Sequence, residues 1–160
     1  MEKPTVKIKL LSKAASTPKY QTPGAVGMDL HACLQKDGIS EEVEIRFGYQ
    51  AKIPTGLSLQ VPDGWEAQVR PRSGLASKGL SVANSPGTID PDYRGEVQVI
   101  LENRCRDTLH TIRHGDRIAQ LVIVPAVQAT IEEVDELDET ERGEGGFGST
   151  GVKEKTDGKK

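Results

Sequence analysis

The stretch Leu57-Ser-Leu-Gln-Val-Pro-Asp-Gly-Trp-Glu-Ala-Gln-Val69 contains two short runs in which every second residue is apolar. The apolar positions are Leu57, Leu59, Val61, Trp65, Ala67 and Val69. A period of two residues is typical of β-strands that bury one face. Pro62-Asp63-Gly64, between the runs, has the composition of a tight turn. The stretch therefore predicts two strands separated by a turn.

Similar runs flank this stretch on both sides. Apolar and polar residues alternate over 6–10, 30–34, 43–47 and 97–101, and turn-forming residues separate the runs. Residues 118–124 are apolar on both faces except at Gln120, which predicts a central strand. No long stretch has the 3.6-residue period of a helix. Short strands with frequent turns predict an all-β fold: a sandwich, a jelly roll or a barrel.

The 160-residue chain is long enough for one domain, and its charge is unevenly distributed. The alternation stops at residue 138, so we expect a β domain over 1–137 and a flexible C-terminal arm over 138–160. Residues 132–160 carry 10 acidic and 5 basic side chains, whereas residues 1–131 carry 14 and 16. This nearly neutral body argues against binding to a nucleic-acid backbone, but local positive charge still suits a small anionic ligand.

The sequence predicts a cytoplasmic protein. Its longest apolar run, 121–124, is far shorter than a membrane helix, and the first ten residues have no apolar signal core. Cys33 and Cys105 form no Cys-x-x-Cys pair and have no zinc-site spacing. Reduced thiols in a cytosol are the simplest interpretation.

Two segments contain side chains that suit a nucleotide. Arg72-Ser73-Gly74 offers a guanidinium, a hydroxyl and free backbone N–H groups, which fit phosphate oxygens. The segment 84–96 offers Asn84 for a base edge, Tyr93 for a sugar or base, and Asp90 as a base or metal partner. For the first segment the alternative is a strand end with solvated arginines. For the second it is an ordinary polar hairpin.

Residues 143–148 match the pattern G-x-G-x-x-G. No strand precedes them and no βαβ unit follows, which excludes a dinucleotide-binding fingerprint, and no Lys-Ser/Thr pair follows as in a phosphate-binding P-loop. A glycine-rich backbone beside Arg142 and Phe147 suits a segment that wraps a phosphate chain and stacks on a base. A glycine-rich linker is the alternative.

Taken together and in order, five segments resemble the five motifs of the homotrimeric dUTP pyrophosphatases (dUTPases). They are residues 25–30 (AVGMDL), 71–76 (PRSGLA), 87–95 (GTIDPDYRG), 115–120 (GDRIAQ) and 142–151 (RGEGGFGSTG). The departures are Met28, where the family often has Tyr or Leu, and Ser85-Pro86 in a variable stretch. The resemblance implies a jelly-roll-like β-barrel with a flexible glycine-rich arm, assembled as a homotrimer with active sites at the subunit interfaces.

The resemblance also assigns roles to residues. Asp90 would orient and deprotonate the attacking water, and Asp29 would hold Mg²⁺ through water without binding it directly. The phosphates would contact Arg72, Ser73, Gly74, Gln120 and, from the arm, Arg142, Gly148, Ser149 and Thr150. The nucleoside would contact Asn84, Gly87, Thr88, Ile89 and Gln98, with Tyr93 beneath the deoxyribose and Phe147 stacked on uracil.

The implied activity is hydrolysis of dUTP to dUMP and pyrophosphate by water attack at the α-phosphorus. It would limit uracil incorporation into DNA and supply dUMP for dTMP synthesis. The sequence has no Ser/His or Cys/His pair, in agreement with a reaction that needs no covalent intermediate. A dCTP deaminase of the same fold and a non-catalytic deoxynucleotide-binding module are the alternatives. The expected partners are dUTP and further copies of the chain, with no nucleic acid and no membrane.

Overall fold

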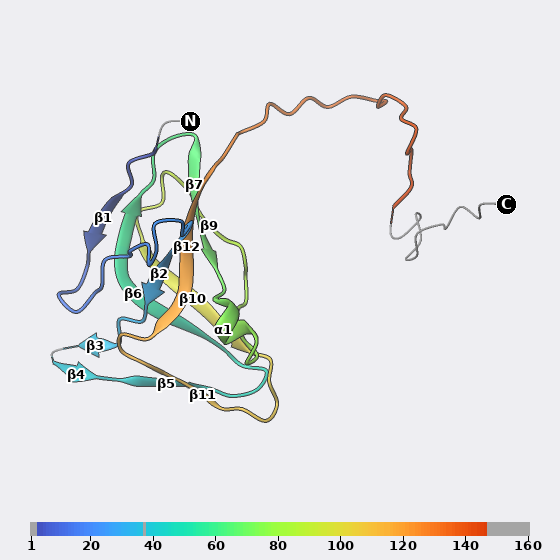
Figure 1. Cartoon of the computed structure of the whole chain (residues 1–160). Coiled ribbons are helices and arrows are strands. Elements are labelled where there is room, and N and C mark those ends of the chain that lie inside the picture. The colour runs from blue at the N-terminus through green and yellow to red at the C-terminus, as the bar shows by residue number, and fades with distance from the viewer. Residues whose placement is uncertain (1–2, 37, 147–160) are drawn as a thin grey trace. The chain divides into compact units, whose positions relative to one another are not determined.

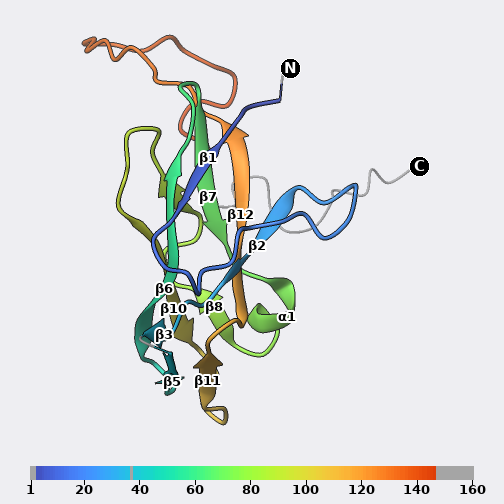
Figure 2. The ribbon, with the colours of Figure 1, turned by 90° about the vertical axis from the view of Figure 1, so that its left-hand side faces the viewer.

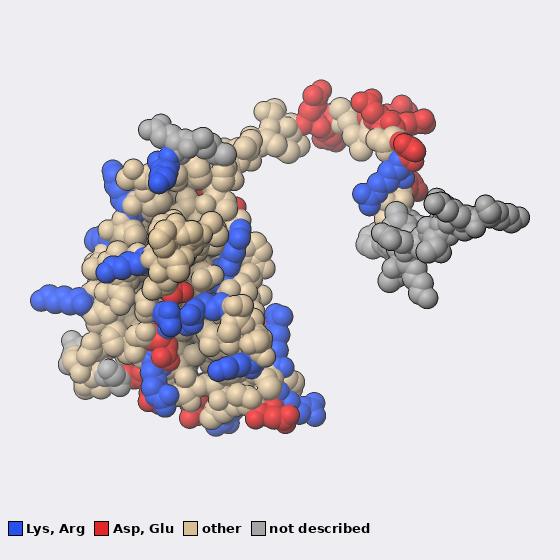
Figure 3. Space-filling view, viewed as in Figure 1, with Lys and Arg blue, Asp and Glu red and all other residues tan. Residues whose placement is uncertain are grey.

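The computed structural model describes residues 3–36 and 38–146 (Figure 1). The chain divides into two units, Met1–Val127 and Gln128–Lys160. The first unit is almost entirely β-structure and contains one short helix, α1 (Ser73–Ala76). In the second unit, residues 128–146 form neither helix nor strand, and Figure 3 shows acidic side chains gathered along it. No helix in the described part of the chain is long and apolar enough to cross a membrane.

Two four-stranded antiparallel sheets form the body of the first unit. The first sheet has the order β1-β6-β10-β8, with β1 (Lys7–Leu10), β6 (Gln50–Gln60), β10 (Glu96–Asn103) and β8 (Leu80–Val82). The second has the order β2-β12-β7-β9, with β2 (Gly27–His31), β12 (Arg117–Pro125), β7 (Trp65–Arg70) and β9 (Gly87–Ile89). All pairings in both sheets are antiparallel.

Two short ribbons complete the unit. β5 (Glu42–Ile45) pairs with β11 (His110–Arg113), and β3 (Gln35–Lys36) pairs with β4 (Ile39–Ser40). Both views place β5 and β11 at one end of the unit (Figure 1, Figure 2). Among the described strands, the hydrogen-bonded sheets remain separate and do not close into a barrel. The predicted all-β, jelly-roll-like architecture is therefore present, but its described sheets are open and not closed as in a barrel.

The stretch 57–69 connects the two sheets. Its first run ends β6 and its second run forms β7, so the turn at Pro62-Asp63-Gly64 carries the chain from one sheet to the other. Gly64 has a φ of 77°, which glycine adopts without strain. Buried apolar side chains of both sheets form one core, which includes Ile53, Leu57, Val99 and Leu101 from the first and Leu30, Ala67, Val69 and Leu121 from the second.

The alternating pattern predicts most of the inward-facing residues, and β12 is the predicted central strand, with β2 and β7 on either side. Two residues differ from the pattern. Leu10 and Phe47 continue apolar runs but are exposed. Leu10 ends the edge strand β1, and β5 already ends at Ile45, two residues before Phe47.

Candidate functional site

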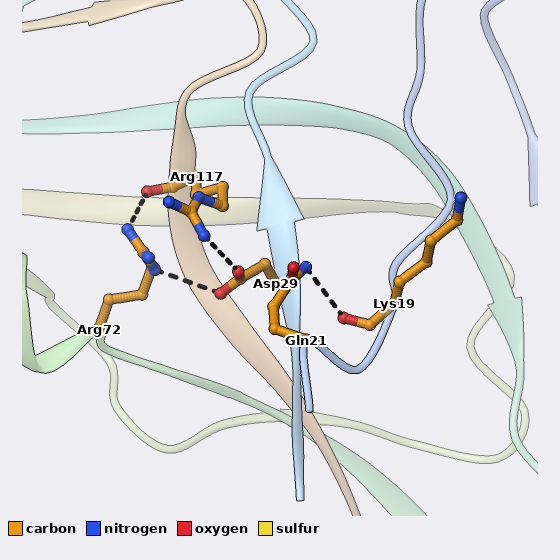
Figure 4. Close-up of polar contacts among 5 residues, drawn as sticks. All are labelled: Lys19, Gln21, Asp29, Arg72 and Arg117. Carbon is orange, nitrogen blue, oxygen red and sulfur yellow. Dashed lines mark hydrogen bonds and ion pairs between the residues drawn. The ribbon is translucent and has the colours of Figure 1, made fainter. Parts of the chain in front are cut away.

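A buried carboxylate organises the first group of polar residues. Asp29 on β2 is only 2% exposed. Its Oδ1 accepts a hydrogen bond from Arg72 Nε and its Oδ2 accepts one from Arg117 Nη1, each at 3.2 Å (Figure 4). Arg72 Nη1 also donates to the carbonyl of Arg117 at 3.1 Å. A buried carboxylate requires such partners, because desolvation of an unpaired charge is costly.

Asp29, Arg72 and Arg117 together form the Asp29 cluster, which has a net positive charge. Two guanidinium groups face one carboxylate, and their side chains remain 26% (Arg72) and 49% (Arg117) exposed. Each guanidinium has five N–H donors, more than the bonds to Asp29 use. The cluster is therefore suited to bind an anion with the outward-facing donors.

Strand register places Gln120 beside this cluster. Gln120 on β12 lies opposite Asp29 on β2, and paired residues project from the same face of a sheet. A Cβ at residue 27 would lie 3.2 Å from Cδ and Oε1 of Gln120. Gly27 thus leaves the space in which the Gln120 amide lies.

A sharp change of direction after β7 brings in the other predicted phosphate ligands. The chain leaves β7 at Arg70, passes through Pro71 and places Arg72 in extended conformation immediately before α1. Ser73 begins α1, and a Cβ at Gly74 would meet no other atom within 4 Å. Open space above Gly74 gives a ligand access to the backbone at this turn.

His31 lies two residues beyond Asp29 on the same strand face. Its Nδ1 is buried and has no hydrogen-bond partner among the described residues. Burial lowers the pKa of His31 below its ordinary value of 6.5. The Asp29 carboxylate opposes this effect, whereas Arg117 and Arg72 add to it. His31 is therefore neutral at pH 7.

A second group of predicted residues lines a cavity of about 240 Å³. The structure brings seven of them together there: Asn84, Gly87, Thr88, Ile89, Asp90, Tyr93 and Gln98. Lys52, which belongs to none of the motifs, also lines the cavity. Lys52 belongs to β6, far from the motifs in the chain, and reaches the cavity because it pairs with Ile100 on β10.

Local packing fixes the wall of this cavity. The Tyr93 hydroxyl donates a hydrogen bond to the carbonyl of Glu96 at 3.1 Å. A Cβ at residue 95 would overlap the Tyr93 ring, so the ring lies against the backbone of Gly95. Asp90 accepts a hydrogen bond at its carbonyl from the Tyr93 N–H at 3.2 Å. Asp90 itself is an exposed residue at this turn.

The two groups do not share a cavity. Asp29, Arg72 and Gln120 are absent from the lining of the 240 Å³ cavity. Asp29 lies on β2 and Thr88 on β9, the opposite edges of a four-stranded sheet, which corresponds to roughly 14 Å at the usual strand spacing. One chain therefore carries the positively charged Asp29 cluster and the 240 Å³ cavity at separate places.

The remaining predicted residues lie in the second unit. Arg142 Nε donates a hydrogen bond to the carbonyl of Gly145 at 2.7 Å. Phe147, Gly148, Ser149 and Thr150 lie outside the described residues.

The described residues contain no group of three or more His, Cys, Asp or Glu side chains that could hold a metal ion. Both Asp29 oxygens already bind guanidinium groups. Mg²⁺ retains several waters and is commonly held by one or two carboxylates together with substrate phosphates. The residues present therefore fit a Mg²⁺ ion held through water and phosphate oxygens, and do not fit a cage of protein ligands.

Comparison with known proteins agrees with the motifs. The model of the dUTPase family matches residues 13–151. The chain belongs to the dUTPase family. It is 58% identical over 136 residues to the deoxyuridine 5'-triphosphate nucleotidohydrolase of Agrobacterium fabrum, an alignment that covers 84% of this chain and 85% of that protein.

Two solved dUTPases have the same fold as this family member. A mutant dUTPase of Staphylococcus bacteriophage 80alpha with dUpNHpp is 30% identical, with a TM-score of 0.77 over 92% of this chain and 99% of that one. A mutant dUTPase of the S. aureus phage phi11, solved to describe a structural Mg(II) ion, is 25% identical, with a TM-score of 0.68 over 82% and 97%. The jelly-roll-like β fold predicted for this dUTPase is thereby confirmed.

Proposed function

We propose that this dUTPase-family chain hydrolyses dUTP to dUMP and pyrophosphate, and so limits uracil incorporation into DNA and supplies dUMP for dTMP synthesis. The observation that carries the proposal is the 240 Å³ cavity, in which an amide, a tyrosine ring and an aspartate converge. The positive cluster around Asp29 adds the donors that a triphosphate requires.

The cavity is proposed to hold the nucleoside. Asn84, Gln98 and the backbone of residues 87–89 supply donors and acceptors for a pyrimidine edge. The Tyr93 ring is fixed by its hydrogen bond to Glu96 and by contact with Gly95, which supports its place beneath the deoxyribose. A ring held in this way leaves a 2′-hydroxyl without space or partner.

The Asp29 cluster is proposed to hold the phosphate chain. Arg72, Ser73, Gly74 and Gln120 would donate to phosphate oxygens, and Asp29 would hold Mg²⁺ through water. Bound Mg²⁺ would neutralise charge on the triphosphate during attack. Arg72 and Arg117 hold the Asp29 carboxylate in place through both of its oxygens, which supports an indirect role for Asp29.

Asp90 is proposed as the general base. Its carboxylate takes a proton from water as the water oxygen bonds to the α-phosphorus, and the bond from that phosphorus to the bridging oxygen breaks. Pyrophosphate leaves with the electron pair of that bond. The arm 138–160 would supply Arg142, Gly148, Ser149 and Thr150 for the phosphates and Phe147 for the base.

We further propose that the active chain is a homotrimer with shared sites. Asp29 and the cavity-lining Thr88 lie on opposite edge strands of one sheet, and the cavity lining lacks Asp29, Arg72 and Gln120, so neither group alone encloses a whole nucleotide. Placing the cluster of one copy against the cavity of another would complete a site.

An assay of released products tests the function. Purified protein is incubated with Mg²⁺ and either dUTP or dCTP, and pyrophosphate and ammonia are both measured. We expect pyrophosphate from dUTP and neither product from dCTP. Ammonia from dCTP would support a deaminase, and nucleotide binding with no product would support a binding module.

A further inference from the structure

We propose that Arg70 is a further substrate-binding residue, which holds the β- or γ-phosphate of the nucleotide; this inference rests on the proposed function. Arg70 ends β7 and lies opposite Gln120 on β12, which in turn lies opposite Asp29 on β2. The three residues thus form one row across three neighbouring strands and project from the same sheet face. Arg70 extends the anion-binding cluster by one strand.

The Arg70 side chain is held in a defined position. Its Nε and Nη2 both donate to Oε1 of Gln68, at 2.9 and 2.6 Å. Gln68 Nε2 in turn donates to Oε1 of Glu66 at 2.5 Å. These residues alternate along β7 and share its outer face. A guanidinium fixed in this way loses less conformational entropy when it binds a ligand.

Gln68 orients Arg70 without neutralising it. The acceptor is an amide, and among the described residues Arg70 forms no ion pair. Two of its five N–H donors bond to Gln68, and the other three have no partner in the described part of the chain. Arg72 and Arg117, by contrast, share the charge of Asp29. Arg70 is thus an exposed, oriented and uncompensated cation beside a proposed phosphate ligand.

The chemistry of the substrate suggests which phosphates Arg70 binds. The β- and γ-phosphates carry most of the negative charge of a nucleoside triphosphate and leave together as pyrophosphate. The product dUMP lacks both groups. An arginine that binds them therefore strengthens the binding of triphosphate and has no effect on the binding of dUMP.

Binding measurements on four proteins test this assignment. The ligands are the non-hydrolysable α,β-imido analogue of dUTP and dUMP, each with Mg²⁺, and the proteins are wild type, Arg70→Met, Gln68→Met and Arg46→Met. Arg70→Met keeps the aliphatic stem and removes the charge. Arg46→Met is the matched control, because it removes one positive charge just after β5, outside the sheet that carries the row.

We expect Arg70→Met to raise the Kd of the analogue about tenfold, the usual effect of losing a hydrogen bond to a charged group, and to leave the Kd of dUMP unchanged. Gln68→Met should have a smaller effect in the same direction, and Arg46→Met none. With dUTP as substrate, KM should rise while kcat changes little. Equal melting temperatures would show that the variants remain folded.

An unchanged Kd of the analogue in Arg70→Met, or an equal weakening of dUMP, would overturn the assignment. If wild type binds the analogue but releases no pyrophosphate from dUTP, the proposed function fails while the Kd comparison still decides the role of Arg70. If wild type does not bind the analogue, both proposals fail.

Discussion

The Tyr93 ring lies in the space that a side chain at residue 95 would occupy, so only glycine at that position permits the observed ring placement. The hydroxyl of the same tyrosine donates to the carbonyl of Glu96. Two independent contacts therefore fix a ring that lines the 240 Å³ cavity. Gly95 is a structural requirement for the proposed discrimination between deoxyribose and ribose.

Gly95→Ala should weaken sugar discrimination by displacing Tyr93. A buried hydroxyl without a partner costs about 1–3 kcal/mol, so the ratio of kcat/KM for dUTP to that for UTP should fall about tenfold. Tyr93→Ala should lower the same ratio, and the double variant should lose little more, because both changes affect one contact. Gly24→Ala is the control, since a Cβ there meets no atom within 4 Å. If Gly95→Ala leaves the ratio of kcat/KM for dUTP to that for UTP unchanged, the placement of Tyr93 in the sugar site is contradicted.

Arg117→Met should destabilise the fold through Asp29. The variant leaves a buried carboxylate with one guanidinium partner, and because Arg117 is 49% exposed we expect a loss of only about 1 kcal/mol in the free energy of unfolding. Urea denaturation measures this loss. In a protein that already carries Asp29→Asn, the same change should cost less, because the buried charge is gone.

Arg113→Met provides the matched control for that experiment. The Arg113–Glu42 pair has two contacts, at 2.7 and 3.4 Å, and so is at least as close as the Arg117–Asp29 pair, but both of its side chains are more than half exposed. Its removal should change stability by less than about 0.5 kcal/mol. If Arg113→Met and Arg117→Met lose the same free energy of unfolding, burial of Asp29 does not strengthen its ion pair with Arg117.

His31 should make the ligand-free protein less stable in mild acid. Its pKa in the folded state is below 6.5, so as the pH falls below 6.5 the unfolded chain takes up the proton first and the free energy of unfolding decreases. Well above pH 6.5 His31 is neutral in both states and the effect vanishes. The drop in melting temperature between pH 7.5 and 5.5 should be smaller in His31→Gln than in wild type. His110→Gln, on the separate strand β11, is the control; equal drops in wild type and His31→Gln would contradict the assignment.

The pattern of apolar residues predicted the strands well, because burial of one strand face requires a period of two. It did not predict which strands pair. The runs that end β6 and form β7 are joined by a turn, yet they belong to different sheets. Strand pairing depends on contacts between distant segments, and these leave no local signal.

The same limit applies to the site. The motifs identified Asp29, Arg72 and Gln120 from their neighbours in sequence. Arg117 and Arg70 lie within or beside those motifs, but their contacts with Asp29 and Gln68 follow from side-chain geometry. Lys52 joins the cavity only through its register with β10.

Mixing two inactive variants should restore activity if sites are shared. Asp90→Asn removes the proposed general base beside the nucleoside cavity, and Arg72→Met removes a proposed phosphate ligand from the Asp29 cluster. If each site takes these parts from different copies, random trimers refolded from an equal mixture should recover about a quarter of wild-type activity. Sedimentation should give the mass of three chains. A mixture that stays inactive would place both residues of a site on one chain.

The most direct test of the account is the turnover of Asp90→Asn. Asparagine keeps the shape of the side chain and removes the base, so pyrophosphate release from dUTP should fall by roughly 10²–10⁴-fold, the usual contribution of a general base. The Kd of the imido analogue should stay within a few-fold of wild type, since the amide still fits the turn. Turnover within a few-fold of wild type would contradict the assignment of Asp90 as the general base.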